Sequence, residues 1–240
     1  MAQVQATGKL QRDNVSGAQT FTNAFPANAT AGNTCFVDIS HYSSIAGSNI
    51  TGVTIGGTAA TLIVRKPSAD NANFAETWRA TNVAGGTRDV VVTLTGVAGQ
   101  YLTCGGDEWD NVQSTPDDGN GTGGPTTSSA PSATTSSSTT VTPTLLRGVF
   151  TDYAGTSWTS ATPPSAWTEA WEETDGTSHE AGSAAYYVDS GATGTKTGTF
   201  ATGSSMSWVC AISAYKLSSS AKSMPVVQTL LNRLPALRRF

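Results

Sequence analysis

The sequence contains few charged residues, and this scarcity narrows the class of protein. Asp, Glu, Lys and Arg make up 12% of its 240 residues, whereas soluble domains usually contain about 25%. Disordered chains combine a low apolar content with many charges, so the sequence predicts a folded domain. The net charge of −4 argues against binding to nucleic acid through neutralised phosphates. Gly, Ser, Thr and Val are abundant instead, which is typical of a β protein with many turns.

Cysteine is also scarce, and its number is odd. With only Cys35, Cys104 and Cys210, at least one thiol stays unpaired, so the chain lacks the disulfide framework of a small secreted domain. None of the three lies in a CxxC motif or beside a histidine at the spacing of a zinc site. We interpret all three as buried apolar residues of a protein assembled in a reducing cytoplasm.

Motifs for cofactors and for nucleophilic catalysis are missing. The sequence has no Walker loop, no GxGxxG and no GxSxG. Residues 107–110 and 117–121 carry oxygen ligands that suit Ca²⁺, but the second group lacks the spacing and the distal Glu of a calcium loop. We interpret both as polar turns, and calcium binding stays open. His41 is expected to be a half-exposed sheet residue. The sequence therefore predicts a protein that is not an enzyme, with no cofactor and no assigned metal ligand.

Long apolar runs are absent as well. No stretch of about 18 apolar residues is present to span a membrane. The N-terminal residues lack the apolar core of a secretory signal. We therefore expect neither a membrane nor a nucleic acid among the partners.

Short alternating segments separated by Gly-rich turns are present throughout. In residues 34–42, Cys35, Val37 and Ile39 face one way and the polar residues the other, as in a strand with one buried face. Similar segments recur every 8–12 residues or so, at residues 50–55, 60–65, 74–80, 89–95, 100–104, 145–150, 183–188 and 207–217. This spacing is typical of an all-β sandwich or a jelly roll.

The two halves of the chain share an order of features. Cys104 is followed by Trp109 at the same spacing as Cys210 by Tyr215, and a strand and a Gly-rich turn precede each pair. A jelly roll consists of two Greek-key halves with matching strands. We therefore predict that residues 1–217 form a single jelly-roll-like β-sandwich of two Greek-key halves. Two small sandwiches are the alternative.

A run of Ser, Thr, Gly and Pro separates the halves. Residues 114–138 contain almost no apolar side chain. We interpret this run as an internal crossover loop that passes from one Greek-key half to the other, with an exposed tip at residues 117–124.

The last residues, 218–240, have a different pattern. Their apolar residues recur as one helical stripe, Pro225 is tolerated in the first turn, and Pro235 ends the helix. A helix of about ten residues is marginal alone in water, so we predict an amphipathic anchoring tail with a basic end. The predicted partner-binding residues are Val226, Val227, Leu230, Leu231, Leu234, Arg238, Arg239 and Phe240.

Three tryptophans lie in a loop rich in Pro, Ser and Thr. Trp158, Trp167 and Trp171 are candidate glycan-binding residues, because aromatic rings stack on sugars; an assembly interface would use the same residue types. The acidic residues nearby also suggest a glycoside hydrolase with Glu172 and Asp175. This is the weakest hypothesis, because the acids fit a solvated loop or strand edge equally.

Two stretches carry a resemblance to a known group of proteins. Residues 50–59 (ITGVTIGGTA) and 88–96 (RDVVVTLTG) resemble jelly-roll structural proteins of tailed bacteriophages, and the match covers residues 20–217. The resemblance implies a non-enzymatic virion protein, assembled in the host cytoplasm, that decorates or cements the capsid or tail. Its partners would be other virion subunits and copies of itself. The alternative is a carbohydrate-binding module that contacts host-cell glycans. Head or tail location, copy number and symmetry stay open.

Overall fold

The structure is a computed structural model that describes residues 3–153, 160–174 and 181–218, and the statements below concern these residues. Every element in this part of the chain is a β-strand, and every pairing of named strands is antiparallel. No helix in it is long and apolar enough to span a membrane. The prediction of an all-β, sandwich-like protein is confirmed.

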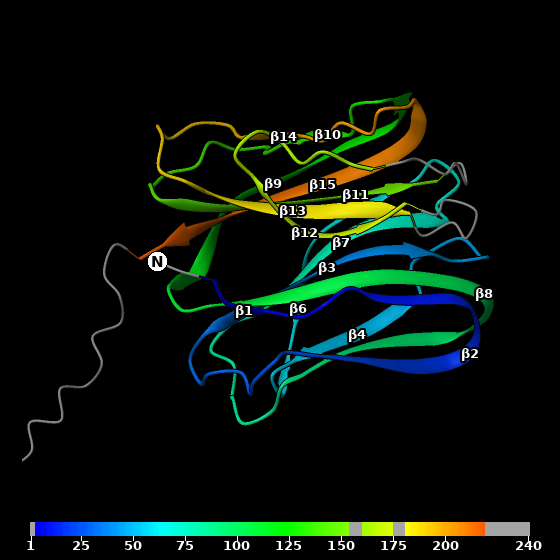
Figure 1. The fold of residues 1–240 in the computed structure, drawn as a ribbon, viewed down its shortest axis with the longest axis horizontal. Coiled ribbons are helices and arrows are strands. Elements are labelled where there is room, and N and C mark those ends of the chain that lie inside the picture. The colour runs from blue at the N-terminus through cyan, green and yellow to red at the C-terminus, as the bar shows by residue number, and fades with distance from the viewer. Residues whose placement is uncertain (1–2, 154–159, 175–180, 219–240) are drawn as a thin grey trace, which may run out of the picture.

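The first half of the chain forms one eight-stranded sheet (Figure 1). Its order is β5-β4-β8-β3-β7-β6, and β1 and β2 also pair with β8. The strands are β1 (Gln3–Ala6), β2 (Leu10–Ala24), β3 (Thr34–Tyr42), β4 (Ile50–Ile55), β5 (Thr58–Ala59), β6 (Thr61–Pro67), β7 (Asn73–Ala80) and β8 (Asp89–Trp109).

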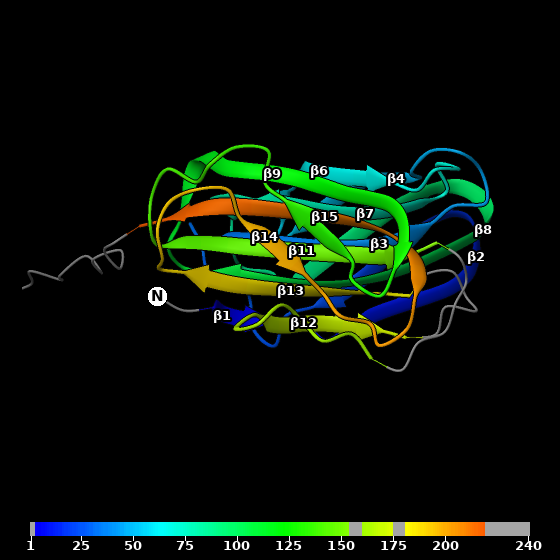
Figure 2. The same cartoon turned by 90° about the horizontal axis from the view of Figure 1, so that it is seen from above.

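The second half forms a five-stranded sheet of order β12-β13-β11-β15-β9 and a two-stranded ribbon, β10-β14. Figures 1 and 2 show the ribbon on the outer side of the five-stranded sheet, away from the first half. The strands are β9 (Val112–Ser128), β10 (Ser132–Thr134), β11 (Thr144–Asp152), β12 (Thr168–Glu173), β13 (Gly182–Asp189), β14 (Thr197–Thr199) and β15 (Met206–Leu217).

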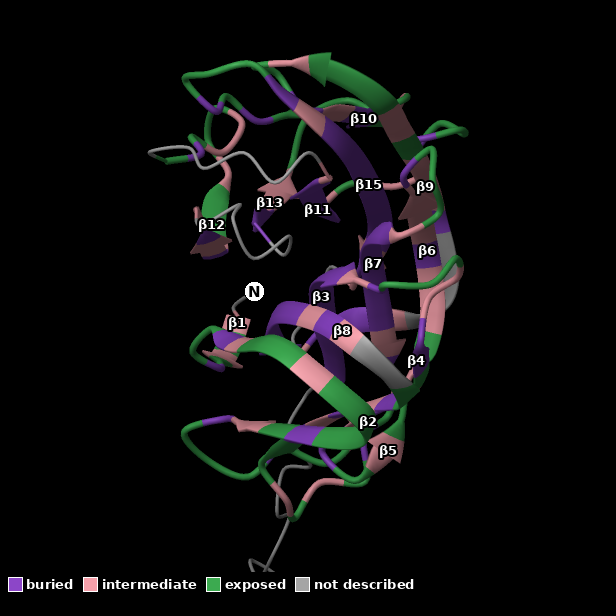
Figure 3. Ribbon diagram, turned by 90° about the vertical axis from the view of Figure 1, so that its right-hand side faces the viewer, coloured by how far each residue is buried: buried purple, intermediate pink, exposed green. Residues whose placement is uncertain are grey.

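The eight-stranded sheet folds over on itself along β8 (Figure 3). Strand β2 pairs with β8 along most of its length. Residues 90–94 of β8 also pair with β4, whereas residues 101–109 also pair with β3. A cluster of buried apolar side chains from β2, β3, β4, β7 and β8 fills the space between the two parts. The first half therefore has a core of its own.

Strand β3 lies in the middle of the molecule and is buried on both faces. Cys35, Val37 and Ile39 belong to the cluster inside the folded sheet, while Phe36 packs on Tyr215 of the second sheet with ring centroids 4.6 Å apart. The predicted alternation is confirmed. The prediction of a single buried face is wrong, because the five-stranded sheet covers the other one.

Two more clusters of buried residues join the halves. One contains Val64 and Ala75 of the first half with Trp171 and Val209 of the second. The other sets Phe36 and Trp109 against residues of β11 and β15. A fourth cluster belongs to the second half alone, between its sheet and the β10-β14 ribbon. Each half thus has its own core, as in the alternative with two small sandwiches. The layer β6-β7-β3-β8 of the first half packs face to face on the layer β12-β13-β11-β15 of the second, and these two layers are called the inner sheets.

The three cysteines are buried and free, as predicted. Burial raises the pKa of each thiol above its ordinary value. All three behave as small apolar residues in this fold.

The Ser, Thr, Gly and Pro run is not a crossover loop. Most of it forms β9, the edge strand that pairs with β15 along its length, and the chain passes between the halves at Asp110 and Asn111. The next residues turn back and lie on β9, where the backbone N–H of Ser136 donates to the carbonyl of Asn120 at 2.8 Å. The prediction for residues 114–138 and for an exposed tip at residues 117–124 is therefore corrected.

Close approach of two backbones explains why this strand lacks apolar side chains. A Cβ at Gly121 would lie 1.8 Å from the carbonyl oxygen of Thr134, and one at Gly123 would lie 1.7 Å from that of Ser132. Alternate residues of a strand share one face, so these two glycines make a flat surface for the returning chain.

Replacing Gly121 with Ala is expected to lower the free energy of unfolding by about 2–3 kcal/mol, because the new methyl group collides with backbone that cannot move without breaking the ribbon. Gly52→Ala in β4 is the matched control, since a Cβ there meets nothing within 4 Å. Chemical denaturation measures both variants. Equal stability of the two would contradict the close packing of residues 132–137 on β9.

The two halves repeat one strand arrangement. The neighbours β6-β7-β3-β8 of the first half correspond to β12-β13-β11-β15 of the second. The outer pair of each half has a β-bulge at the same step of the ladder. Matching rows of paired residues cross the strands, namely Arg65, Glu76, Ile39 and Cys104 in the first half and Glu172, Ser183, Phe150 and Cys210 in the second. Cys104 and Cys210, which have similar surroundings in the sequence, thus also occupy equivalent positions in the strand register.

Candidate functional site

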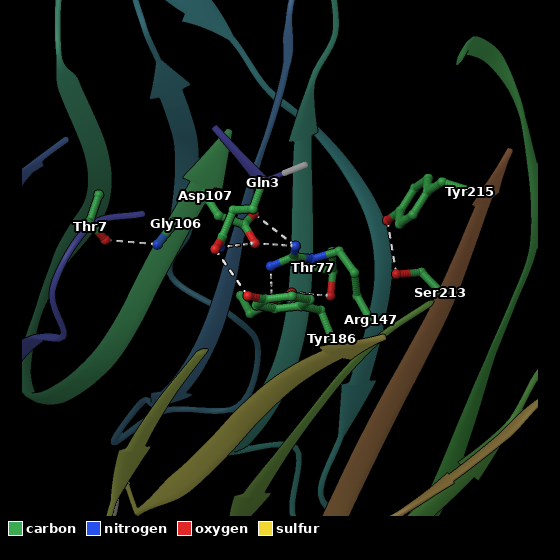
Figure 4. A network of polar contacts seen from close by, with 10 residues as sticks. Gln3, Thr7, Thr77, Gly106, Asp107, Arg147, Tyr186, Ser213 and Tyr215 are labelled. Carbon is green, nitrogen blue, oxygen red and sulfur yellow. Dashed lines mark hydrogen bonds and ion pairs between the residues drawn. The ribbon is translucent and has the colours of Figure 1, made fainter. Parts of the chain in front are cut away.

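A group of buried charges lies between the two inner sheets and is centred on Arg147 of β11 (Figure 4). Its Nη1 donates to both carboxylate oxygens of Asp107 at 2.7 Å, and its Nη2 donates to Asp38. The side chains of Arg147, Asp107 and Asp38 are 1%, 2% and 0% exposed. Since both acids belong to the first half and the arginine to the second, these ion pairs hold the halves together.

Neutral groups complete the network. The guanidinium carbon of Arg147 lies 4.7 Å from the ring centroid of Phe36, at the distance of a cation–π contact. Three further hydrogen bonds link Thr77 Oγ1 to Asp38 (2.7 Å), Gln3 Nε2 to Asp107 (3.3 Å) and Tyr186 Oη to Gln3 Oε1 (3.0 Å). Strand β1 therefore takes part in the network through Gln3.

Burial and the neighbouring charges shift the pKa values of Asp38 and Arg147 in opposite directions. Burial raises the pKa of the Asp38 carboxyl, and the attraction of Arg147 offsets part of that rise. Burial alone would lower the pKa of Arg147, but the carboxylates of Asp107 and Asp38 raise it well above its usual range. The arginine therefore stays charged, and the network contains two acids against one base.

The pKa of Asp38 predicts a pH dependence of stability. Because this pKa lies above its usual value of 3.8, the folded chain binds more protons than the unfolded chain between the two values. The stability that this group contributes is complete below pH 3.8 and is lost as pH rises through the raised pKa. Asp38→Asn cannot titrate, so its unfolding free energy relative to the wild type should increase with pH across that window. Denaturation curves from pH 3 to 8 test this, and an offset independent of pH would contradict it.

The buried network is not among the sites predicted from the sequence, although the sequence contains a signal for it. Asp38 and Arg147 each stand in the middle of a strand that is otherwise mostly apolar. Charged residues are rarely buried unless they are paired, so a charge in such a strand indicates a buried partner on another strand. Asp107 and Glu108 were expected in a polar turn but lie buried in β8, where Glu108 accepts a hydrogen bond from Asn33 at 2.6 Å.

The predicted tryptophan platform is not assembled in the described residues. Trp171 is 3% exposed and packs between the halves, so close to β8 that a Cβ at Gly105 would lie 2.6 Å from its ring. Trp167 is half-buried on the opposite face of the second sheet, with its ring 6.3 Å from that of Tyr187. Trp158 lies outside the described residues.

A β-bulge explains why these two tryptophans separate. Trp171 lies in β12 and Trp167 directly precedes it. If the strand were regular and extended back to Trp167, residues four apart would share one face. The register of β12 shifts between Glu169 and Trp171, and a shift of one residue moves a side chain to the other face. Trp171 is therefore a core residue and not part of a glycan-binding surface.

Of the remaining candidate residues, some lie in the described part of the chain and others lie outside it. Glu172 accepts a hydrogen bond from the backbone N–H of Ala161, while its proposed catalytic partner Asp175 lies outside the described residues, as do all eight predicted partner-binding residues between Val226 and Phe240. In the part of the chain with assigned structure, no group of three or more His, Cys, Asp and Glu residues is placed to hold a metal ion.

His41 is fully buried, which corrects the expectation of a half-exposed residue. Its ring stacks on Phe74 at a centroid distance of 5.9 Å. Burial, with the nearby charge of Arg65, lowers the pKa of His41 to about 3. The imidazole is therefore neutral and belongs to the interior.

Comparison of the chain with models of protein families, with characterised proteins and with solved structures found no match. The resemblance to phage jelly-roll proteins therefore stays a prediction.

Proposed function

We propose that the chain is a non-enzymatic structural protein of a bacteriophage particle, a surface module related to jelly-roll proteins with two Greek-key halves. The observation that carries this proposal is the position of the two stretches with the phage resemblance. They are neighbours, because β4 pairs with the first part of β8 and Val53 stands opposite Val92. The stretches thus form one continuous sheet over the core of the first half, which supports their origin in one structural unit.

The ion pairs between the two halves are consistent with a structural role for the protein. Arg147 and its two acids join the halves, and Lys9 of the first half lies 2.6 Å from Glu173 of the second. These contacts connect segments that are far apart in sequence and make one body from two sheets. In this proposal the body is displayed on the particle, and residues 219–240 attach it to a neighbouring virion subunit.

Removing residues 219–240 is expected to leave the sandwich folded and to abolish its incorporation into particles, because the apolar stripe that binds the neighbour is lost. Purified particles are analysed for the truncated chain, and its circular dichroism is compared with that of the full chain. Normal incorporation would contradict the attachment.

A pair of substitutions in the full chain separates the stripe from the rest of the tail. Leu230→Asp places a charge on the predicted stripe, whereas Gln228→Asp places one on the opposite side of the same helical pattern. Only the first is expected to reduce incorporation. Equal effects of the two would show that charge, and not the stripe, governs attachment.

A further inference from the structure

The inner sheets of the two halves meet as the subunits of a symmetric dimer do. Strand register defines which residues are equivalent. One row across the first half contains Thr61, Arg79, Phe36 and Asp107, and the corresponding row of the second contains Thr168, Tyr186, Arg147 and Ser213. By the same register Asp38 corresponds to Val149 and Ser40 to Thr151.

Some of these equivalent residues contact one another directly. The hydroxyls of Ser40 and Thr151 are 2.6 Å apart, and the guanidinium of Arg147 lies over its equivalent, Phe36. Such contacts occur where a two-fold axis passes between two copies of a surface.

Other contacts occur in reciprocal pairs. Arg79 lies 5.4 Å from the ring centroid of Tyr215. Its equivalent, Tyr186, lies 5.3 Å from the ring of Trp109, which is the equivalent of Tyr215. When residue i contacts j and the equivalent of i contacts the equivalent of j, the interface is isologous. The chain is therefore built as a covalent pair of like halves about an approximate two-fold axis.

The charges break this symmetry. Both buried acids belong to the first half, and the second has Val149 and Ser213 at the equivalent positions. The arginine belongs to the second half, and the first has Phe36 in its place. Two first halves facing each other would bury four carboxylates without the arginine that pairs with them in the native network. Two second halves would bring Arg147 against Arg147 without an acid.

We propose that the Arg147, Asp38 and Asp107 network determines which halves pair. A buried charge without a partner is strongly unfavourable, and discrimination between similar partners commonly relies on such a penalty. The network therefore allows a first half to bind a second half and rejects like halves from two copies of the chain. This disfavours pairing between neighbouring copies through like halves, and it does not depend on the particle to which the module belongs.

The test replaces each charged residue with its equivalent from the other half. The triple variant Asp38→Val, Asp107→Ser, Arg147→Phe keeps apolar packing and removes the charge difference. Wild type and variant are unfolded in denaturant, refolded over a range of concentrations and separated by size-exclusion chromatography with light scattering. The wild type is expected to refold as a monomer at all concentrations. The variant should shift toward dimers and larger oligomers as the concentration rises.

A single cysteine identifies the pairing. In a pair of first halves residue 40 would face residue 40 of the other copy, so Ser40→Cys should give covalent dimers under oxidation in the triple variant. In the wild-type background residue 40 faces Thr151, and no such dimer is expected. A triple variant that refolds as a monomer without crosslinks would overturn the proposal.

A second variant covers a failure of the first to fold. Asp38→Asn, Asp107→Asn, Arg147→Gln retains the shapes of the two acids, keeps a polar group at each position and removes the charges, so it should show the same shift to oligomers. Monomeric refolding of this neutral variant would equally overturn the proposal. Arg147→Lys, which keeps the charge, should refold as a monomer.

Discussion

Replacing Arg147 with Met is expected to lower the free energy of unfolding by about 3–5 kcal/mol, because two buried carboxylates lose the cation that they share. Methionine is long and flexible and can fill most of the space that the arginine leaves. The loss therefore reflects charge more than volume. Arg147 offsets part of the rise that burial causes in the pKa of Asp38. Without it the pKa of Asp38 rises further, so the stability of the variant should recover as the pH is lowered toward 4.

Chemical denaturation at pH 7 and pH 4 measures this effect. Lys9→Met is the control, because Lys9 also forms an ion pair between the halves but is 37% exposed, and exposed pairs contribute about 0–1 kcal/mol. If both variants lost the same stability, the buried network would have no special part in joining the halves.

Trp171→Ala is expected to cost about 3–5 kcal/mol, as is usual when a buried tryptophan is removed from a core. Its ring fills the cluster that the two halves share, against Val64, Ala75 and Gly105. Trp167→Ala should cost less, about 1–2 kcal/mol, because its side chain is only partly buried on the outer face.

The comparison also separates a core role from a binding role. Thermal denaturation ranks the two variants, and a glycan array run on both shows whether either contributes to sugar binding. A larger loss of stability in Trp167→Ala, or loss of sugar binding in a stable Trp171→Ala variant, would contradict the position assigned to Trp171.

Much of the fold could be predicted from local patterns, because alternation is a property of single strands. The face of β3 with Cys35, Val37 and Ile39 is visible in the sequence for this reason. That its other face is also buried depends on a second sheet from residues more than 100 positions away. The polar side chain of Asp38 looks solvated until its partner is known.

The site and the long polar run were harder to predict, for two physical reasons. A run without apolar residues usually indicates a loop, but in β9 the glycines allow backbone to pack on backbone, which leaves no hydrophobic signal. The bulge in β12 separates Trp167 from Trp171, and a bulge is set by pairing with β13, which the sequence of β12 alone does not contain.

The face-to-face packing of two equivalent halves can be tested with one pair of cysteines. The double variant Ser40→Cys, Thr151→Cys places two thiols where the hydroxyls are 2.6 Å apart. On mild oxidation of the folded protein, mass spectrometry of a proteolytic digest should find a disulfide between positions 40 and 151 within one chain, and the protein should stay monomeric. Two free thiols at these positions, or a disulfide only between chains, would contradict the account.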